Sequence, residues 1–488
     1  MIKKGKILIC LIAIMIMSSV IVFAGYNIEK VNLNSNYKLI GKFNNGLAVV
    51  QNNYVYGEKY GYINSNGNVV IPCQYEYASD FNEGYAIIQK NTVYSKKWGV
   101  IDTQGKEYLW DETFDSIIGP VSNGKVLVQK YERWTFVDIY GKKASDFRYF
   151  NINSFSDGLA LIKNSGKAGY IDTATKQVIP FNYIDGKNFN EGLAPVKTNL
   201  TWNYIDKNNN IVIKGTYYVD ATEFSEGVAA IAKEELLGKR YALINKKGEF
   251  LSNFVFEEVG KNIEGLIPVK QYSVWGFADC TGNIIVKPKY TSVSNFSGGY
   301  ATVCLNGKWG VIDAQGNEII ELKYHEANDV GNGIVALKYY NTWNLFKISK
   351  KENANISKQK IYINGNLVNF ETYNILDNNY VKLRDVVYMI GKYNLNYNIT
   401  WNAEKQRIDI ISNKKYVTEG NEMKILNSNK VTKTGIKNSS SIFVDEISRN
   451  ILAYTIDGYN YMKLRDLGNV LNFEVEYNEN NNSVYIKI

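Results

Sequence analysis

A six-residue element recurs along most of the chain and constrains its fold more than any other feature. Phe-Asn-Glu-Gly-Tyr-Ala at residues 81–86 returns as Phe-Asn-Glu-Gly-Leu-Ala at 189–194 and as Phe-Ser-Asp-Gly-Leu-Ala at 155–160. The glycines that mark the copies are Gly46, Gly84, Gly124, Gly158, Gly192, Gly227, Gly265, Gly299 and Gly333, at spacings of 34 to 40 residues. Repetition at such a period is typical of tandem supersecondary units. We therefore predict nine units, which occupy residues 40–346.

A second element follows each marker and joins an aromatic residue to a glycine. Its clean copies are Lys-Trp-Gly-Val-Ile-Asp at residues 97–102 and 308–313, and Trp-Gly-Phe-Ala-Asp at 275–279 is a close variant. The residues concerned are Trp98, Gly99, Trp275, Gly276, Trp309 and Gly310. We expect the glycine to let a neighbouring ring or backbone approach closely, and the aromatic ring to fill the junction between units. The alternative is that these rings form a sugar-stacking surface.

Each unit is predicted to fold as three or four short antiparallel strands. In the second unit, a strand at residues 85–89 leads through a polar loop of variable length to the Trp-Gly strand at 98–102. That strand ends in Asp-Thr-Gln-Gly, which predicts a type I turn with positive φ at Gly105. Strand residues such as 47–50 are apolar on both faces, so we expect neighbouring units to cover both.

The two recurring elements resemble those of the WG-repeat family. The resemblance covers all nine units, and it implies a structural or binding array rather than a reaction. The predicted fold class is mainly β, a tandem array that is either open and curved or propeller-like, followed by a small α+β part. Because nine units exceed the four to eight blades typical of propellers, the open, curved array is favoured.

The polar residues form no catalytic constellation. Acidic residues recur with the turns of the units, whereas a glycosidase needs two unique carboxylates. The one histidine, His325, stands where another copy has an ordinary polar residue, so we expect it at the surface. Cys73, Cys280 and Cys304 lie at unrelated repeat positions without a Cys-x-x-Cys motif and are expected to be free. We predict that the chain is not an enzyme, and we predict no cofactor and no metal site.

The N-terminus predicts export. Lysines within the first six residues precede an apolar run at residues 7–23, a pattern typical of a signal peptide over residues 1–24 with cleavage after Ala24. The alternative is an uncleaved membrane anchor; no later stretch predicts a transmembrane segment. We expect a secreted or cell-envelope protein of a bacterium. The formal net charge of +8 is weak for 488 residues, so nucleic acid is not an expected partner.

A different duplication follows residues 347–360, which are rich in Lys, Asn and Ser and are predicted to be a linker. Residues 373–385 match residues 454–466 without a gap. Each copy predicts a β-hairpin, a helix and a second β-hairpin, in units at 361–412 and 413–488. The signature residues at the two helix starts are Leu383, Arg384, Asp385, Leu464, Arg465 and Asp466. Because they recur, a structural ion pair or a helix-start contact is favoured over a ligand site.

This second pattern is similar to the stalk domain that is named after the N-terminal domain of copper amine oxidases. The name implies no oxidation chemistry, which needs copper bound by His residues in a separate catalytic domain. For the whole chain we predict an exported, non-enzymatic scaffold that binds a protein or cell-envelope partner. The binding residues would lie in variable loops, such as 52–59, 91–97 and 233–239. A glycan- or cell-wall-binding module that uses exposed Tyr and Trp is the alternative, and an enzyme with an unrecognised site is the third hypothesis.

Overall fold

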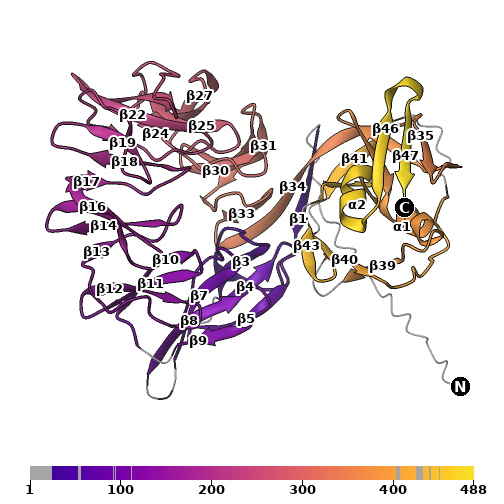
Figure 1. The fold of residues 1–488 in the computed structure, drawn as a ribbon, viewed down its shortest axis with the longest axis horizontal. Helices are drawn as coiled ribbons and strands as arrows, with labels where there is room; N and C mark the ends of the chain where they lie inside the picture. Colours follow the sequence, from indigo (N-terminus) through magenta and orange to yellow (C-terminus); the bar gives the residue numbers. More distant parts are fainter. Residues whose placement is uncertain are drawn as a thin grey trace, which may run out of the picture. The chain divides into compact units, whose positions relative to one another are not determined.

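The computed structural model describes residues 25–488 except 53–56, 92, 94, 111–112, 403–406, 425–431, 439–440 and 450. The predicted signal peptide, residues 1–24, lies outside the described residues. The chain divides into two compact units, a repeat unit of residues 29–347 and a C-terminal unit of residues 348–488 with the stretch that ends at residue 28. In Figure 1 the strands of the repeat unit run from indigo to orange, and the C-terminal unit continues in orange and yellow.

Within the residues that the structure describes, the repeat unit holds nine sets of antiparallel strands, here called blades, one for each marker glycine. Blade 1 contains β2 (Tyr37–Ile40), β3 (Leu47–Asn52), β4 (Tyr60–Asn64) and β5 (Val69–Tyr75). Blade 2 contains β6 (Tyr77–Ala78), β7 (Tyr85–Asn91), β8 (Lys96–Asp102) and β9 (Glu107–Leu109). Blade 3 contains β10 (Ser116–Ser122), β11 (Lys125–Lys130) and β12 (Arg133–Asp138). Blade 4 contains β13 (Asn151–Ile152), β14 (Leu159–Asn164), β15 (Lys167–Asp172) and β16 (Gln177–Tyr183). Blade 5 contains β17 (Asp185–Gly186), β18 (Leu193–Lys197), β19 (Trp202–Asp206) and β20 (Ile211–Ile213). Blade 6 contains β21 (Asp220–Ala221), β22 (Val228–Glu235) and β23 (Gly238–Asn245). Blade 7 contains β24 (Glu258–Val259), β25 (Leu266–Gln271), β26 (Val274–Asp279) and β27 (Ile284–Tyr290). Blade 8 contains β28 (Ser292–Val293), β29 (Tyr300–Leu305), β30 (Lys308–Asp313) and β31 (Glu318–Tyr324). Blade 9 contains β32 (Glu326–Ala327), β33 (Ile334–Tyr339) and β34 (Thr342–Ile356). The prediction of three or four short antiparallel strands per unit is confirmed.

The core of the repeat unit lies between the blades. On β3 of blade 1, Leu47 and Val49 join a buried cluster with Phe81 of blade 2. The alternate residues Ala48 and Val50 face the other side of the same strand and join a different cluster, with blade 9. A single blade would leave both apolar faces in water, so the blades depend on their neighbours for a dry interior.

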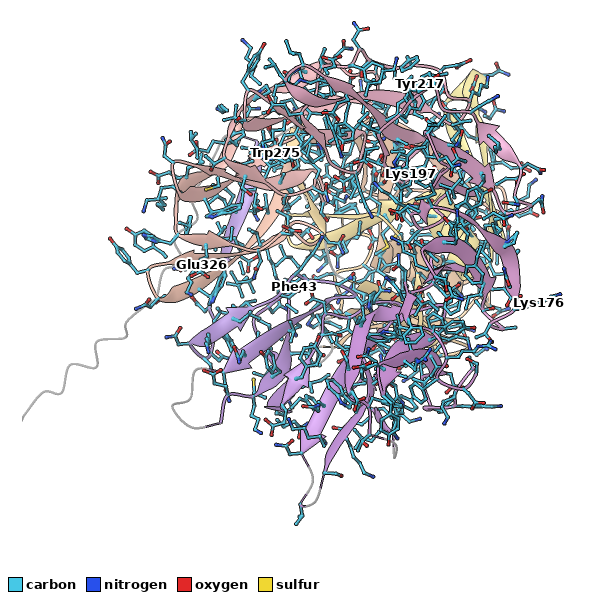
Figure 2. All side chains as sticks on the ribbon, turned by 90° about the vertical axis from the view of Figure 1, so that its left-hand side faces the viewer. Phe43, Lys176, Lys197, Tyr217, Trp275 and Glu326 are labelled. Atoms are coloured by element: carbon cyan, nitrogen blue, oxygen red, sulfur yellow. The ribbon has the colours of Figure 1, made fainter. Side chains whose placement is uncertain are left out.

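Blade 9 packs against blade 1, so the array is closed. Ile334 and Leu345 of blade 9 share a buried cluster with Phe43 of blade 1. The indole Nε1 of Trp343 donates to the carbonyl oxygen of Lys38 at 3.2 Å. In Figure 2 the labelled residues of blades 4, 5, 6, 7, 9 and 1 follow one another in chain order around the unit. The preference for an open array was wrong, because the angle between neighbouring sheets depends on the side chains between them and not on the number of repeats.

The ninth blade takes its fourth strand from the other end of the chain. β1 (Tyr26–Val31) pairs with β34, beyond the order β32-β33-β34. Val31, at the end of β1, joins the buried cluster between blades 9 and 1. The N-terminal strand therefore completes the last blade and adds a backbone ladder to the side-chain packing at the point of closure.

Most of the predicted linker is a strand. β34 extends from Thr342 to Ile356 and covers the larger part of residues 347–360. Within the C-terminal unit it pairs with β41 (Thr432–Asn438), with Asn353 opposite Thr434. Ala354 on this segment is fully buried between more exposed neighbours. The Lys- and Asn-rich composition concealed the strand because its long polar side chains lie at the exposed positions.

The C-terminal unit repeats the predicted order of hairpin, helix and hairpin. Its further elements are β35 (Lys360–Ile363), β36 (Asn366–Val368), β37 (Thr372–Ile375), β38 (Asn378–Lys382), α1 (Leu383–Gly391), β39 (Tyr397–Asn402), β40 (Arg407–Ser412), β42 (Ser441–Val444), β43 (Ile447–Arg449), β44 (Ala453–Ile456), β45 (Tyr459–Lys463), α2 (Leu464–Leu471), β46 (Glu474–Asn478), a 3-10 turn (Glu479–Asn481) and β47 (Ser483–Lys487). Of the helices in the described part of the chain, none is long and apolar enough to cross a membrane.

The two copies in this unit are interlocked and do not form the two separate units predicted at 361–412 and 413–488. β35 of the first copy pairs in parallel with β47 of the second, and β40 pairs in parallel with β42. The hairpins β37–β38 and β44–β45 meet through β38 and β45. Leu383 and Val387 of α1 share one core with Leu467 and Leu471 of α2. Each copy therefore completes the sheets of the other.

Candidate binding surface

Every marker glycine stands in the same tight turn between the first and second strands of its blade. In blade 6, Glu226 has φ 46° and Gly227 has φ 78°. Two successive left-handed residues are the type I′ geometry of short β-hairpins. The residue before the marker glycine and the glycine itself have positive φ in all nine blades. The nine marker turns, as we call them, thus share one conformation.

The acidic residue of a marker turn binds the marker turn of the next blade. The carboxylate of Glu226 accepts the backbone N–H groups of Glu264 and Gly265, each at 3.0 Å. Glu264 in turn accepts those of Gly298 at 2.6 Å and Gly299 at 2.8 Å. The same contact joins Glu83 to Gly124 at 3.3 Å, Asp157 to Gly192 at 2.6 Å and Glu191 to Gly227 at 3.0 Å. These acids are engaged in holding blade to blade.

The glycine of the Trp-Gly element lies where the following strand passes closest. A methyl group at Gly310 would lie 2.5 Å from the carbonyl oxygen of Ile320. Gly99 and Gly276 face the carbonyl oxygens of Tyr108 and Val286 just as closely. The close neighbour is therefore backbone, and the pairing of the two strands is irregular at Gly276 and at Gly310.

The tryptophans of this element fill the junction only in part. Trp98, Trp275 and Trp309 are half-buried. In blade 7 a fully buried ring lies two residues later, Phe277, whose centroid is 4.7 Å from that of Phe296 in blade 8. At the same position blades 2 and 8 have the buried Val100 and Val311. The expectation that the Trp ring fills the junction is corrected to this extent. Residues two apart on a strand lie on the same face, and Trp98 and Trp275 pack as partly buried rings at the edge of the interblade clusters that contain Val100 and Phe277.

The opposite end of the blades carries several of the most exposed apolar residues of the repeat unit. Because successive strands alternate in direction, the turns between second and third strands, here called tip turns, all lie away from the marker turns. The exposed apolar residues of the tip turns, which we call the tip surface, are Val93, Tyr131, Leu200, Leu236, Leu237, Tyr272 and Tyr340. Val93, Leu236 and Leu237 lie in the loops 91–97 and 233–239, for which we predicted binding from the sequence.

Three tyrosines of the tip surface have a conformation that their residue type disfavours. Tyr131, Tyr272 and Tyr340 have φ of 50°, 52° and 51° and are 81%, 89% and 69% exposed. Left-handed backbone costs an aromatic residue about 1 kcal/mol or more. At the equivalent tip turn blade 8 has Asn306 followed by Gly307, the sequence that such a turn prefers. The backbone conformation therefore gives no reason for tyrosine at these positions.

Each of these strained turns is held by a side chain from the segment before its blade. Asp115 accepts the N–H of Tyr131 at 2.7 Å, and Glu257 accepts the N–H of Tyr272 at 3.0 Å. His325 accepts the N–H of Tyr340 through Nδ1 at 3.1 Å. These hydrogen bonds fix the backbone of the three turns, while the three rings are exposed.

The tip hairpins are also rich in cations. Residues 90–97, 130–133, 163–167, 197–202, 233–240, 270–274, 305–308 and 338–342 hold 14 Lys and Arg against 3 Asp and Glu. Several of these lysines pair with acids nearby, such as Lys270 with Glu258 at 2.6 Å and Lys338 with Glu326 at 2.9 Å. The tip hairpins therefore keep an excess of positive charge.

His325 and the cysteines have structural surroundings. His325 is half-buried and contacts the ring of Tyr340, with centroids 4.8 Å apart. Cys73 is half-buried, Cys280 exposed and Cys304 buried, and all three are free thiols. Burial raises the pKa of the Cys73 thiol, so this thiol is a weak nucleophile at neutral pH.

The signature residues Arg384 and Asp385 both make contacts at the start of α1, but they do not pair with each other. Arg384 pairs with Glu419. Asp385 is buried, accepts the N–H of Met423 at 3.0 Å and lies 3.7 Å from the ammonium of Lys382. Burial raises the pKa of the Asp385 carboxyl, against the opposing hydrogen bond of Met423 and charge of Lys382. In the second copy, Leu464 is buried, Asp466 is half-buried and Arg465 is exposed.

Comparison with known families agrees with this architecture. The model of the WG containing repeat matches residues 60–94, 134–167, 169–202, 202–236, 241–273, 275–309 and 309–343. The chain is a WG-repeat protein. The model of the copper amine oxidase N-terminal domain matches residues 362–486, which lie within its C-terminal unit.

Individual proteins resemble this WG-repeat protein only distantly. No curated protein matches it. A crystal structure of the eukaryotic initiation factor is 10% identical, covers 57% of this chain and 87% of its own, and has a TM-score of 0.45. Kluyveromyces lactis Hsv2 is 10% identical over 58% of this chain and 100% of its own, with a TM-score of 0.32. The tricorn protease is 11% identical, and the match covers 63% of this chain and 38% of the protease chain, with a TM-score of 0.24.

Proposed function

We propose that this WG-repeat protein is an exported, non-enzymatic scaffold that binds an acidic protein of the bacterial cell envelope on its tip surface. The observation that carries the proposal is the exposure of Tyr131, Tyr272 and Tyr340 at strained turns. Exposed aromatic side chains beside cations are the residues that contribute most to protein interfaces. The signal-like N-terminus supports export, and the C-terminal unit would space the ring from the envelope or dock it there.

The test compares binding of the full chain with that of a triple variant. Tyr131, Tyr272 and Tyr340 are replaced by Asn, which suits left-handed backbone, so the variant is expected to fold at least as well. The matched control is Tyr140→Asn, at an exposed turn at the other end of β12. Binding to isolated cell envelopes of the producing bacterium is measured by sedimentation at low and at raised salt.

We expect the triple variant to lose most of the binding and Tyr140→Asn to keep it, and we expect raised salt to weaken the wild type. Pretreatment of the envelopes with protease should abolish binding. Binding that survives protease but is competed by soluble sugars would support the alternative, a glycan-binding module that stacks these tyrosines on sugar rings. Unchanged binding of the triple variant would refute the tip surface as the site.

A further inference from the structure

The one histidine of the chain holds one turn of the tip surface. His325 accepts the backbone N–H of Tyr340 through Nδ1 at 3.1 Å. Tyr340 has φ 51°, so this hydrogen bond stabilises a conformation that the residue type disfavours. At Tyr272 the acceptor is the carboxylate of Glu257, and the third strained turn, at Tyr131, also has a carboxylate acceptor. One of three similar contacts thus uses a different chemical group.

The repeat places this histidine at a position that other blades fill with an acid. His325 stands eight residues before the marker glycine of blade 9, as Glu257 does in blade 7 and Glu76 in blade 2. Each of the three follows a buried Tyr or Phe. The position is therefore shared, and blade 9 differs in having an imidazole where the other two have a carboxylate.

An imidazole can accept the N–H of Tyr340 only while it is uncharged. A neutral ring carries one N–H and one acceptor nitrogen, whereas a protonated ring carries an N–H on both nitrogens and accepts nothing. Protonation of His325 would set two N–H groups against each other and remove the hydrogen bond. Histidine side chains ordinarily gain this proton between about pH 8 and 5, where Asp and Glu keep their charge. Mild acid should thus act on the turn of Tyr340 and spare that of Tyr272.

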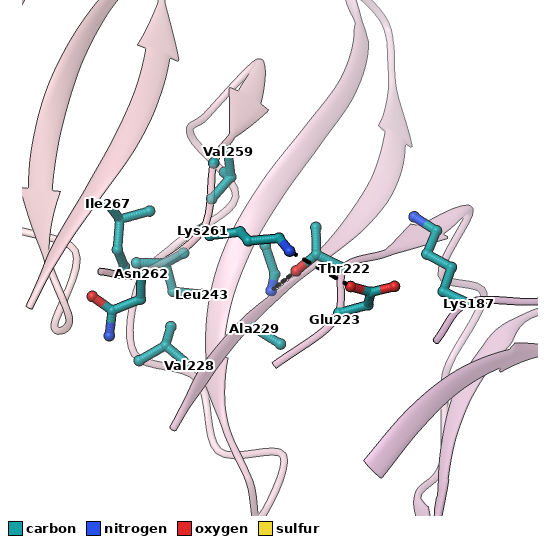
Figure 3. Close-up of a pocket in the computed structure, with 12 residues that line it drawn as sticks. Lys187, Thr222, Glu223, Val228, Ala229, Leu243, Val259, Lys261, Asn262 and Ile267 are labelled. Atoms are coloured by element: carbon teal, nitrogen blue, oxygen red, sulfur yellow. Dashed lines mark hydrogen bonds and ion pairs between the residues drawn. The ribbon is translucent and has the colours of Figure 1, made fainter. Parts of the chain in front are cut away.

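A lysine lies beside the other nitrogen of the ring. The ammonium of Lys308 on β30 is 3.1 Å from Nε2 of His325. Beside a carboxylate such a cation is attractive: Figure 3 shows Lys261 next to Glu223, 3.9 Å apart, where Glu223 accepts the backbone N–H of Asn188 at 3.0 Å. Beside an imidazole it is not, because a protonated ring would bring two positive charges together. We therefore expect a protonated ring to leave this place.

The other charged and titratable groups near the histidine do not replace the lost acceptor. Glu326, the next residue, on β32, pairs with Lys338 of β33 at 2.9 Å, and Tyr324 at the end of β31 is buried. The rings of Tyr339 and Tyr340 have their centroids 5.8 and 4.8 Å from that of the imidazole. Their faces attract a cation weakly at an exposed site. This attraction supplies no acceptor for the N–H of Tyr340.

We propose that His325 makes the tip surface sensitive to pH: its protonation releases the turn of Tyr340 and weakens binding of the envelope partner. The hydrogen bond is present while the ring is neutral and is lost as pH falls through the ordinary range of histidine, whereas the turns of Tyr131 and Tyr272 stay closed. Release of the turn follows from the contacts of His325 alone. Only its effect on binding rests on the function proposed above.

The first test follows the turn without any partner. Hydrogen exchange of the full chain is measured by mass spectrometry at about pH 7.5 and about pH 5.0, the two sides of the ordinary range of histidine. Peptides that contain Tyr340 and Tyr272 are compared as protection factors, which remove the pH dependence of the chemical exchange rate. We expect protection at Tyr340 to fall about fivefold in acid, the factor that one hydrogen bond contributes, and protection at Tyr272 to stay constant.

Two variants assign the effect to the imidazole. His325→Glu introduces the acceptor of blade 7, so protection at Tyr340 should be the same at both pH values. His325→Leu removes the acceptor, so protection should be low at both. The proposal fails if Tyr340 and Tyr272 respond alike to pH, if Tyr340 is unprotected in wild type already at the higher pH, or if His325→Glu keeps the response to acid.

The second test measures sedimentation with isolated cell envelopes at the same two pH values. Wild type should bind up to about fivefold more weakly in acid, because the apparent affinity falls with the fraction of molecules in the binding conformation. His325→Glu should bind equally at both. Equal pH dependence in wild type and His325→Glu would refute the effect on binding. If wild type binds envelopes at neither pH, the proposed function fails, and with it the effect on binding, while the exchange measurement still decides whether the turn is released.

Discussion

The carboxylate of Glu226 in blade 6 accepts the backbone N–H of Gly265 in blade 7 at 3.0 Å. Both residues belong to the same recurring element, one unit apart, so a single sequence motif supplies the acceptor of one junction and the donor of the preceding one. The glycine follows the acid because two left-handed residues form the turn that points the N–H groups at the neighbouring blade. The contact between blades therefore explains why the acidic residue and the glycine are adjacent in the motif.

Glu226→Ala should destabilise the repeat unit by about 1–3 kcal/mol, because it leaves the N–H groups of Glu264 and Gly265 without their acceptor. Glu132→Ala is the matched control, since Glu132 also has positive φ but is exposed in a tip turn. The free energy of unfolding is measured in urea. Equal losses in the two variants would show that the contact between the blades contributes nothing.

The same contacts predict loss of stability in acid. Burial would raise the pKa of Glu191 and of Asp157, but hydrogen bonds from Lys246 and Lys207 and from backbone N–H groups of the next marker turn outweigh it and lower both. A lowered pKa in the folded state adds stability above the ordinary values of 4.5 and 3.8, and this stability is lost as pH falls through the lowered values. The melting temperature should therefore fall below about pH 4.5.

The double variant Glu191→Gln with Asp157→Asn checks the cause of this acid sensitivity. Its melting temperature should be lower than that of wild type at neutral pH and should change less between pH 5 and 3. An unchanged slope in this range would assign the acid sensitivity to other carboxylates.

Gly276→Ala should destabilise the chain more than Gly265→Ala, although only the second replaces a residue with positive φ. A methyl group at Gly276 would collide with the carbonyl oxygen of Val286, whereas one at Gly265 meets no atom within 4 Å. We expect a loss of about 3 kcal/mol from overpacking in the first case and about 1 kcal/mol from backbone strain in the second. Urea unfolding of both variants gives the comparison, and the reverse order would mean that the strands separate at little cost.

Local signals predicted the blades because their causes lie within a few residues. Asp102 predicts a turn, and its carboxylate accepts the N–H groups of Gln104 and Lys106 while Gly105 has φ 87°. Leu383, Val386, Val387 and Ile390 recur at the spacing of one helix face, and all four are buried in α1. Both depend on neighbours in the chain.

The remaining features depend on residues far apart in the chain. The sequence contains nothing local that brings Trp343 to Lys38, and closure of the ring was therefore missed. The exchange of strands in the C-terminal unit was missed for the same reason, since the offset between the copies shows that they are alike and not which strands pair. His325 did leave a signal, because it is the one histidine of the chain and takes the repeat position of Glu76.

Lys433→Met should destabilise the C-terminal unit by about 3–5 kcal/mol. Lys433 and Glu371 are almost fully buried, 3.3 Å apart, and Tyr373 and Tyr461 donate to the same carboxylate. Burial would lower the pKa of Lys433, but its hydrogen bonds and the charge of Glu371 raise it. Removing the ammonium leaves a buried carboxylate without its cation.

The control for Lys433→Met is Lys437→Met, at an exposed position of the same strand β41. Its free energy of unfolding in urea should change by less than about 0.5 kcal/mol. Similar losses in both variants would attribute the effect to the strand and not to the buried pair. Adding Glu371→Gln to Lys433→Met should recover part of the loss, because the buried charge is then removed.

Gly331→Ala should weaken the closure of the ring. Gly331 stands in blade 9 at the position of Ser156 in blade 4, whose hydroxyl donates to the carbonyl oxygen of Phe189 at 2.7 Å. At the closing junction the backbones are closer, and a methyl group at Gly331 would collide with the carbonyl oxygen of Phe43. We expect hydrogen exchange to accelerate in blades 1 and 9 first, because each blade depends on its neighbours for burial. Ser156→Ala removes one hydrogen bond without a collision, and it should cost about 1 kcal/mol and leave blades 1 and 9 protected. Faster exchange spread evenly over all nine blades in Gly331→Ala would show that closure is not a separate step.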